Sequence, residues 1–191
     1  VEGFEKETDY RRGKGVFQKI ISTMEALRDE GVMFGFSATP MRHNNEPLVS
    51  DDFIDFYLDK GVFFGWYFNY VPVGRDPDPS LMPTVQQRLH CYNRIREIRA
   101  TKPILAADFW CDGPLTHGCL SAGRTYFHIN ADGGVEPCVF HQFSVDNILG
   151  KPLIEVLNSP YFQYMRQAVE AERNTLRPCP IIDRPNILRK A

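Results

Sequence analysis

The stretch VFFGWYFNYV, residues 62–71, contains the longest apolar run of the chain, Val62 to Phe68, and is followed by Pro72. A run of this length fits a buried β-strand. It is much shorter than the roughly 18–20 apolar residues that a membrane-spanning helix needs. We therefore expect a strand at this position and no membrane as a partner.

Outward from this stretch, apolar segments of strand character alternate with segments of helical periodicity. The strands are expected at residues 32–38, 62–71 and 104–109, and the helices at 16–31, 51–61 and 84–100. Alternation of this kind, at roughly 30 residues per unit, predicts a parallel sheet covered by helices. Three units cannot close an eight-stranded barrel, and the first residue is not Met, so we expect the rest of a (β/α) TIM-like barrel to lie upstream of Val1.

The pattern changes after Asp112. Residues 125–130 and 135–140 read as two strands joined by the turn Asp132-Gly133-Gly134, and helical segments follow at 153–157 and 159–171. The fold class expected is therefore α/β, with the C-terminal part of a barrel at residues 1–109. A small α+β module with a β-hairpin is expected at residues 110–191.

Composition excludes several classes of protein. The 191 residues carry a formal net charge of −2, which gives no electrostatic footprint for nucleic acid or an anionic membrane. The five cysteines are odd in number and widely spaced, unlike a secreted disulfide framework. We expect a cytoplasmic protein that binds neither nucleic acid nor membrane and whose cysteines hold metal.

Four of the cysteines are candidate metal ligands. Cys119 and Cys138 flank the predicted hairpin, Cys179 returns from the Pro-rich tail, and Cys111 lies eight residues before Cys119. Four thiolates suit an iron–sulfur cluster and equally a structural zinc ion. Cys91, inside a predicted helix, is expected to be a buried small hydrophobe.

The segment from Cys119 to Cys138, CLSAGRTYFHINADGGVEPC, resembles the SPASM and twitch modules of radical S-adenosylmethionine (radical SAM) enzymes. Their pattern is a Cys, nine to fifteen residues, a Gly, four residues and a Cys. Here thirteen residues separate Cys119 from Gly133, and four separate Gly133 from Cys138. The resemblance covers roughly residues 110–182 and implies an auxiliary [4Fe–4S] cluster.

The first fifteen residues resemble a loop of the same enzymes that carries Asp-x-x-Arg before Gly-x-Gly, here Asp9, Arg12, Gly13 and Gly15. The resemblance implies that three residues lie near S-adenosylmethionine: Arg12, Ser37 and Thr39. It also implies that the aromatic run at residues 67–70 faces the pocket, although such a run fits a core equally well.

Two departures from the family pattern qualify this resemblance. The CxxxCxxC motif of the catalytic cluster is absent, so it would lie upstream and this fragment alone would be inactive. The second group of SPASM cysteines is also missing, which favours a twitch-like module with one cluster and an incomplete ligand set. The open position would take substrate or an exogenous ligand, or His117 or His141 would fill it.

The function implied is that of an oxidoreductase-type radical SAM enzyme, in which a 5′-deoxyadenosyl radical takes hydrogen from a peptide or small-molecule substrate. The upstream half of the same protein would be the other partner. The alternative is a zinc-stabilised binding or scaffold module without catalysis. Metal analysis would distinguish the two, because the enzyme would contain iron and sulfide and the scaffold module would contain zinc.

Overall fold

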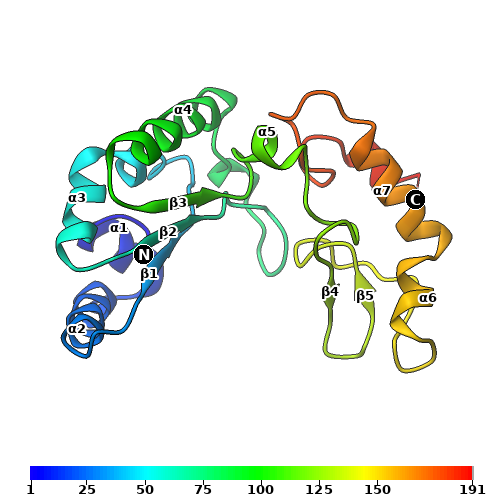
Figure 1. Cartoon of the computed structure of the whole chain (residues 1–191), viewed down its shortest axis with the longest axis horizontal. Coiled ribbons are helices and arrows are strands. Elements are labelled where there is room, and N and C mark those ends of the chain that lie inside the picture. Colours follow the sequence, from blue (N-terminus) through cyan, green and yellow to red (C-terminus); the bar gives the residue numbers. More distant parts are fainter. Residues whose placement is uncertain (191) are drawn as a thin grey trace. The chain divides into compact units, whose positions relative to one another are not determined.

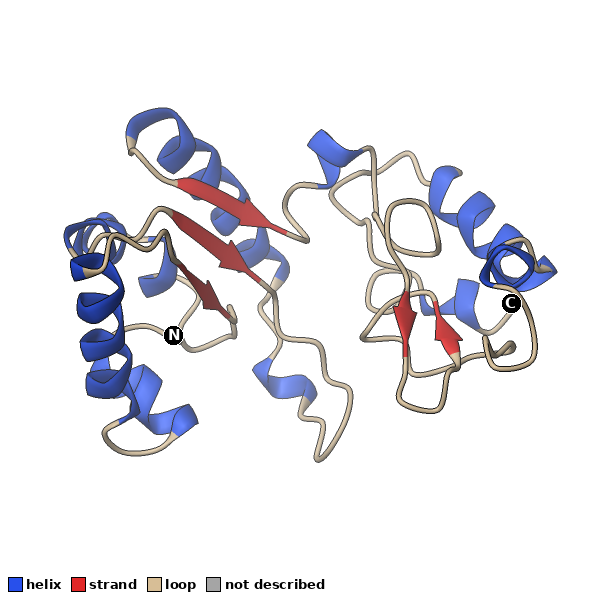
Figure 2. Cartoon of the chain, turned by 60° about the horizontal axis from the view of Figure 1, so that its bottom comes forward, coloured by secondary structure: helices blue, strands red, loops and turns tan. Residues whose placement is uncertain are grey.

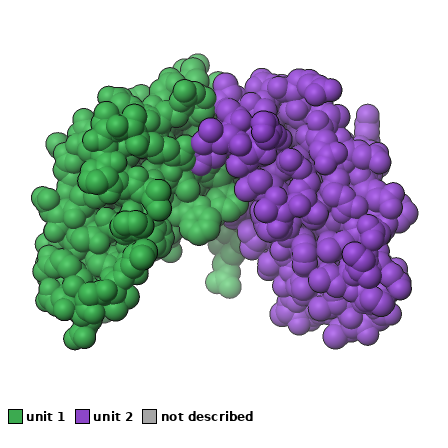
Figure 3. All heavy atoms as spheres, viewed as in Figure 1, with its two compact units in different colours: residues 1–111 green, residues 112–191 purple. Residues whose placement is uncertain are grey.

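The structure is a computed structural model that describes residues 1–190. It divides into two compact units, Val1–Cys111 and Asp112–Ala191, coloured separately in Figure 3. The elements of the first unit are α1 (Glu5–Arg12), α2 (Val16–Asp29), β1 (Gly35–Ala38), the 3-10 helix η1 (Pro47–Val49), α3 (Asp51–Asp59), β2 (Phe64–Tyr67), η2 (Pro79–Leu81), α4 (Val85–Thr101) and β3 (Leu105–Asp108). Those of the second unit are α5 (Gly113–Thr116), β4 (His128–Ile129), β5 (Val135–Glu136), α6 (Leu153–Leu157), α7 (Pro160–Glu170) and α8 (Pro185–Leu188).

The first unit is built on the predicted parallel sheet, in the order β1-β2-β3 (Figure 1). Its register pairs Ser37 with Trp66 and Trp66 with Ala107. Helices α2, α3 and α4 share one hydrophobic core with one face of the sheet, formed among others by Phe17, Ile21, Phe36, Phe53, Tyr57, Tyr67, Ile95 and Ala106. The three parallel strands of a mixed α/β fold are thus confirmed, although each is only four residues long.

The other face of the sheet carries exposed residues. Phe64, Trp66 and Leu105 alternate along β2 and β3 with the buried positions. The rings of Trp66, Phe68 and Phe109 stack, with centroids 4.9–5.4 Å apart. This face therefore presents an aromatic surface within the unit, on the side of the sheet away from its helices.

The first fifteen residues differ from the expected loop, because residues 5–12 form helix α1. The Glu7 side chain accepts a hydrogen bond from the Phe4 N–H at 3.2 Å, which satisfies a donor at the start of the helix. Asp9 accepts bonds from the N–H groups of Gly15 (2.6 Å) and Phe17 (2.8 Å), which fixes the start of α2. These are charged and capping interactions, which apolar periodicity does not detect.

The second unit is a two-stranded hairpin packed with helices (Figure 2). Its core gathers Ala122 and Val135 with apolar residues of α6, α7 and α8, including Val156, Phe162, Met165, Val169 and Ile187. The hairpin strands are two residues each, shorter than expected. Among residues 1–190, no helix has the length and apolar character needed to cross a bilayer.

Gly133 lies in the hairpin turn with φ +81°, and a Cβ atom there would meet Asn147 Oδ1 at 2.8 Å. The Asn147 amide donates to the Asp132 carbonyl at 2.6 Å, and its Oδ1 accepts from the Leu149 N–H at 2.7 Å. The Ile148 N–H donates to the Gly133 carbonyl at 3.0 Å. Gly133, the glycine of the Cys–Gly–Cys pattern, is therefore required both by its backbone conformation and by the close approach of Asn147.

Candidate functional site

The hairpin module brings the segments of Cys119 and Cys138 side by side. The N–H of Ala122, three residues after Cys119, donates to the carbonyl of Pro137, which precedes Cys138, at 2.9 Å. Cys119 Sγ lies 2.9 Å from Ser121 Oγ. The sequence prediction that these two cysteines belong to one neighbourhood agrees with this hydrogen bond.

Cys179 is held in a tight turn of the tail. Its N–H donates to Asp183 Oδ2 at 3.1 Å, and the Asp183 N–H donates back to the Cys179 carbonyl at 3.0 Å. Burial raises the pKa of the Cys179 thiol to about 12, opposed by the backbone N–H of Ile182 and reinforced by the charge of Cys119. Cys119 therefore lies close enough to Cys179 to affect the pKa of the Cys179 thiol.

Tyr126 contacts Cys138. Its hydroxyl lies 3.0 Å from Cys138 Sγ. Burial raises the pKa of Tyr126 well above its ordinary value, and negative charge on Cys138, Cys119 and Cys179 raises it further. The pKa of Cys138 is also raised, mainly by burial. No spacing signal in the sequence pointed to Tyr126.

The three sulfur atoms are not spaced for one ion. Ligands of a tetrahedral zinc lie about 3.8 Å apart, from a Zn–S distance of about 2.3 Å. Among the described residues, only Cys91, Asp108 and Cys111 form a group of three whose ligand atoms lie within 4.8 Å of one another. Cys119, Cys138 and Cys179 do not form such a group.

The other predicted ligands have the following surroundings within their own units. Cys111 is the last residue of the first unit, and its Sγ lies 3.6 Å from the Arg88 carbonyl. His117 is exposed at the end of α5. His141 Nδ1 lies 3.2 Å from the Tyr161 hydroxyl, and burial lowers its pKa.

The three residues predicted to lie near S-adenosylmethionine, Arg12, Ser37 and Thr39, make different contacts in the structure. Arg12, at the end of α1, binds Glu2 Oε1 through Nε at 2.8 Å and Nη2 at 2.5 Å. Ser37 is exposed on β1, beside Trp66 in the register. Thr39 directly follows β1, and its carbonyl accepts from Asn44 Nδ2 at 3.2 Å.

Unsatisfied polar atoms lie in the loops that follow β1 and β2. Both amide atoms of Asn45 and both of Asn69 are buried without a hydrogen-bond partner. Oε2 of the fully buried Glu2 is also without one. By contrast, the side chain of the neighbouring Asn44 is fully paired with backbone groups. It accepts a hydrogen bond from the Met41 N–H and donates to the carbonyls of Glu2 and Thr39. Buried amides without partners are rare in native proteins and call for an explanation such as a ligand.

A family model matches part of the second unit. Residues 119–180 match the SPASM family, described as an iron–sulfur cluster-binding domain. Among curated proteins, none matches the chain.

Solved structures share the fold. The structure of SuiB from Streptococcus suis bound to S-adenosylmethionine matches at 14% identity with a TM-score of 0.60, over 94% of this chain and 48% of that one. A histidine-tagged form of anSMEcpe with bound AdoMet matches at 12% identity and a TM-score of 0.66, over 96% and 53%. Native anSMEcpe with bound AdoMet and the Cp18Cys peptide matches at 13% and 0.64, over 96% and 56%. The chain thus spans about half the length of the structures that it matches.

These findings confirm the resemblance drawn from the sequence, a radical SAM-type fold with a SPASM-type module. The matched family supports the predicted iron–sulfur cluster, and two of the structures that share the fold contain bound S-adenosylmethionine. The zinc-stabilised scaffold is not favoured, because the matched family binds iron–sulfur clusters.

Proposed function

We propose that the chain is part of a radical SAM enzyme of oxidoreductase type, in which residues 1–109 belong to a partial (β/α) barrel and residues 110–191 form the auxiliary cluster module. The observation that carries this proposal is the gathering of Cys119, Cys138 and Cys179 around Tyr126 inside the SPASM match. The three parallel strands with helices on one face support the barrel assignment. The rest of the barrel, the upstream half of the protein, would supply the CxxxCxxC motif.

The auxiliary group is a [4Fe–4S] cluster bound by the thiolates of Cys119, Cys138 and Cys179. The residues fit this group because they are thiols within the matched iron–sulfur family and two of them receive backbone N–H groups, from Phe140 for Cys138 and from Ile182 for Cys179. Hydrogen bonds to the sulfurs are one of the means by which a protein sets a cluster's potential. Tyr126 would donate to the Cys138 sulfur in the same way.

Cys111 is the fourth ligand that the sequence predicts. Its sulfur lies within 4.8 Å of Cys91 Sγ and of an Asp108 carboxylate oxygen inside the first unit. We therefore propose three cysteine ligands and one iron open to substrate or to an exogenous ligand. The predicted four-cysteine set is the competing arrangement, and the variants described below distinguish the two.

S-adenosylmethionine would bind at the carboxyl ends of the strands, where ligands bind in parallel α/β folds. The buried amides of Asn45 and Asn69 fit a polar ligand, because both lie in loops after β1 and β2 and have no partner within the protein. Arg12, Ser37 and Thr39 are the further contacts that the resemblance implies. When bound, S-adenosylmethionine would supply the radical, and these residues would orient it.

The substrate proposed is a peptide or a small molecule with an apolar part. One of the matched structures of anSMEcpe contains a peptide. In this chain the stacked rings of Trp66, Phe68 and Phe109 form an apolar surface on the sheet face that a barrel would enclose. Aromatic faces bind planar and aliphatic groups with little loss of conformational entropy.

The test is a series of variants of the intact protein, reconstituted anaerobically with iron and sulfide. Cys119→Ala, Cys138→Ala and Cys179→Ala should each lose about four irons and four sulfides per chain. Ser121→Ala is the matched control, because it removes a neighbour of Cys119 Sγ but no proposed ligand. Full iron and sulfide content in the three cysteine variants would contradict the ligand assignment.

A further inference from the structure

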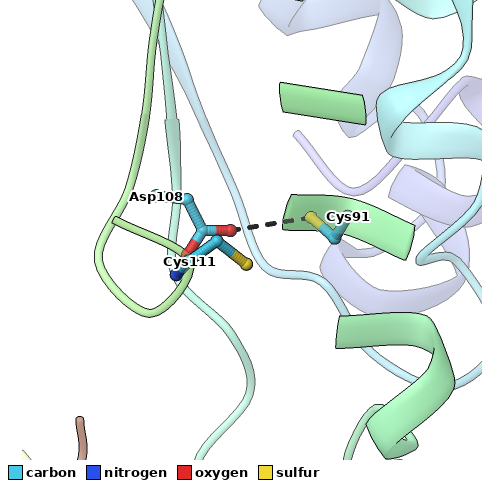
Figure 4. A group of neighbouring side chains, drawn as sticks. All are labelled: Cys91, Asp108 and Cys111. Atoms are coloured by element: carbon cyan, nitrogen blue, oxygen red, sulfur yellow. Dashed lines mark hydrogen bonds between the residues drawn. The ribbon is translucent and has the colours of Figure 1, made fainter. Parts of the chain in front are cut away.

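A second group of ligand-type side chains lies inside the first unit and shares no residue with the SPASM match. Cys91 comes from the middle of α4, Asp108 is the last residue of β3, and Cys111 follows three residues later. One carboxylate oxygen and the two sulfurs all lie within 4.8 Å of one another. The three residues are 0%, 1% and 6% exposed. Figure 4 shows the Asp108 carboxylate facing the Cys91 sulfur, with Cys111 beside it.

Backbone contacts hold this group in place. Asp108 Oδ1 accepts from the N–H groups of Trp110 and Cys111, both at 2.7 Å. Its other oxygen, Oδ2, lies 3.6 Å from Cys91 Sγ. Cys111 Sγ lies 3.6 Å from the carbonyl of Arg88, one turn before Cys91 on α4. The carboxylate is thus oriented by two amides through one oxygen, while its second oxygen faces the thiols.

The spacing is that of ligands around one ion. With Zn–S of about 2.3 Å and Zn–O of about 2.0 Å, tetrahedral geometry puts sulfur and oxygen ligands about 3.5 Å apart. The observed separation of Cys91 Sγ and Asp108 Oδ2 is 3.6 Å. We propose that Cys91, Asp108 and Cys111 form a mononuclear site for a thiophilic divalent cation such as Zn²⁺, separate from the auxiliary cluster.

Binding at this site is an exchange of protons for metal. In the metal-free protein both thiols act as hydrogen-bond donors, Cys91 to Asp108 Oδ2 and Cys111 to the Arg88 carbonyl, so both carry their protons. A divalent cation would displace the two thiol protons to solvent and bind two thiolates and one carboxylate, which leaves the site with a net charge of −1. The Arg88 carbonyl or a water molecule would complete four ligands.

This site also explains why Cys111 would be absent from the cluster. A cysteine bound to zinc in the first unit is not available as the fourth ligand in the second. The inference goes beyond the proposed function, since the cluster of Cys119, Cys138 and Cys179 does not depend on it. The two assignments can therefore fail separately.

The experiment uses the intact protein carrying Cys119→Ala, Cys138→Ala and Cys179→Ala, so that the module's own thiols bind nothing. It is dialysed against Zn²⁺, and bound zinc is counted with and without the further change Cys91→Ala. We expect Cys91→Ala to lower the count by about one zinc per chain. Asp108→Asn keeps an oxygen that accepts from the Trp110 and Cys111 amides but loses the charge, and it should weaken zinc binding at this site by about tenfold or more.

Equal zinc counts with and without Cys91→Ala would overturn the proposal and leave the two cysteines as packing residues. It would also be overturned if, in the otherwise unchanged protein, Cys111→Ala lost iron and sulfide while Cys91→Ala kept both. That pattern would assign Cys111 to the cluster. Circular dichroism checks that each variant is folded. If Cys91→Ala does not fold, the zinc count of Asp108→Asn decides instead.

Discussion

Replacing Gly133 by Ala should weaken the hairpin turn between the first two cluster cysteines. The left-handed backbone at φ +81° costs an L-residue about 1–2 kcal/mol. The new Cβ would also lie 2.8 Å from Asn147 Oδ1 and displace a side chain that makes two hydrogen bonds, worth about 1 kcal/mol each. The expected loss in the free energy of local opening is about 2–4 kcal/mol.

Amide hydrogen exchange measures this loss where it occurs. The N–H groups of Val135 and Ile148 donate to the carbonyls of Asp146 and Gly133, each at 3.0 Å. Their exchange should be about 30- to 700-fold faster in Gly133→Ala, since each 1.4 kcal/mol is a factor of ten. Tryptophan fluorescence should report no comparable change, because both tryptophans, Trp66 and Trp110, lie in the first unit.

Gly150→Ala is the matched control for this measurement. A Cβ at Gly150 meets nothing within 4 Å, and its φ is not in the left-handed range. Both changes alter the unfolded chain in the same way. The control should stay within about 0.5 kcal/mol of the parent. If Gly133→Ala exchanged as slowly as Gly150→Ala, the reasoning about the motif glycine would be wrong.

Two further changes follow from the buried polar atoms and the raised pKa values. Asn69→Leu removes two unpartnered amide atoms, so the free energy of unfolding should stay the same or rise by about 1–3 kcal/mol. The same change should raise the Kd for S-adenosylmethionine, measured by calorimetry, by about tenfold or more. Asn44→Leu, which breaks three hydrogen bonds, should instead destabilise the protein, and equal losses of stability in both would contradict the ligand explanation. In the metal-free protein, the pKa of Cys179 is raised from 9.0 to about 12, so its contribution to stability is complete below pH 9 and disappears as the pH rises towards 12. Urea unfolding between those pH values should show a flatter pH dependence in Cys179→Ala, and an unchanged slope would refute the assigned pKa.

The sequence predicted the alternation of helices and strands because each element has its own apolar periodicity. The central strand was expected over residues 62–71, whereas β2 covers only Phe64–Tyr67. Beyond β2, the Phe68 N–H still donates to the Ala38 carbonyl at 2.9 Å, and the Phe68 ring stacks with Trp66 and Phe109 across the sheet face. Apolar content identifies such a segment but does not show where its strand pairing ends.

The cysteines show the same difference between local and tertiary information. Cys119 and Cys138 were expected to be neighbours because one hairpin connects them, and the structure agrees. Cys91 was expected to be buried, and it is fully buried. Its contact with Asp108 and Cys111 depends on how α4 packs against β3, which no spacing in the sequence encodes.

The most direct test of the central claim measures the metal bound by Cys119, Cys138 and Cys179 in the second unit. The intact protein, purified without oxygen, would be compared with the variant that lacks Cys119, Cys138 and Cys179 for iron, acid-labile sulfide and zinc. The account predicts that the variant loses about four irons and four sulfides per chain and no zinc. A loss of zinc alone, with iron and sulfide unchanged, would contradict the auxiliary cluster and restore the zinc-stabilised module.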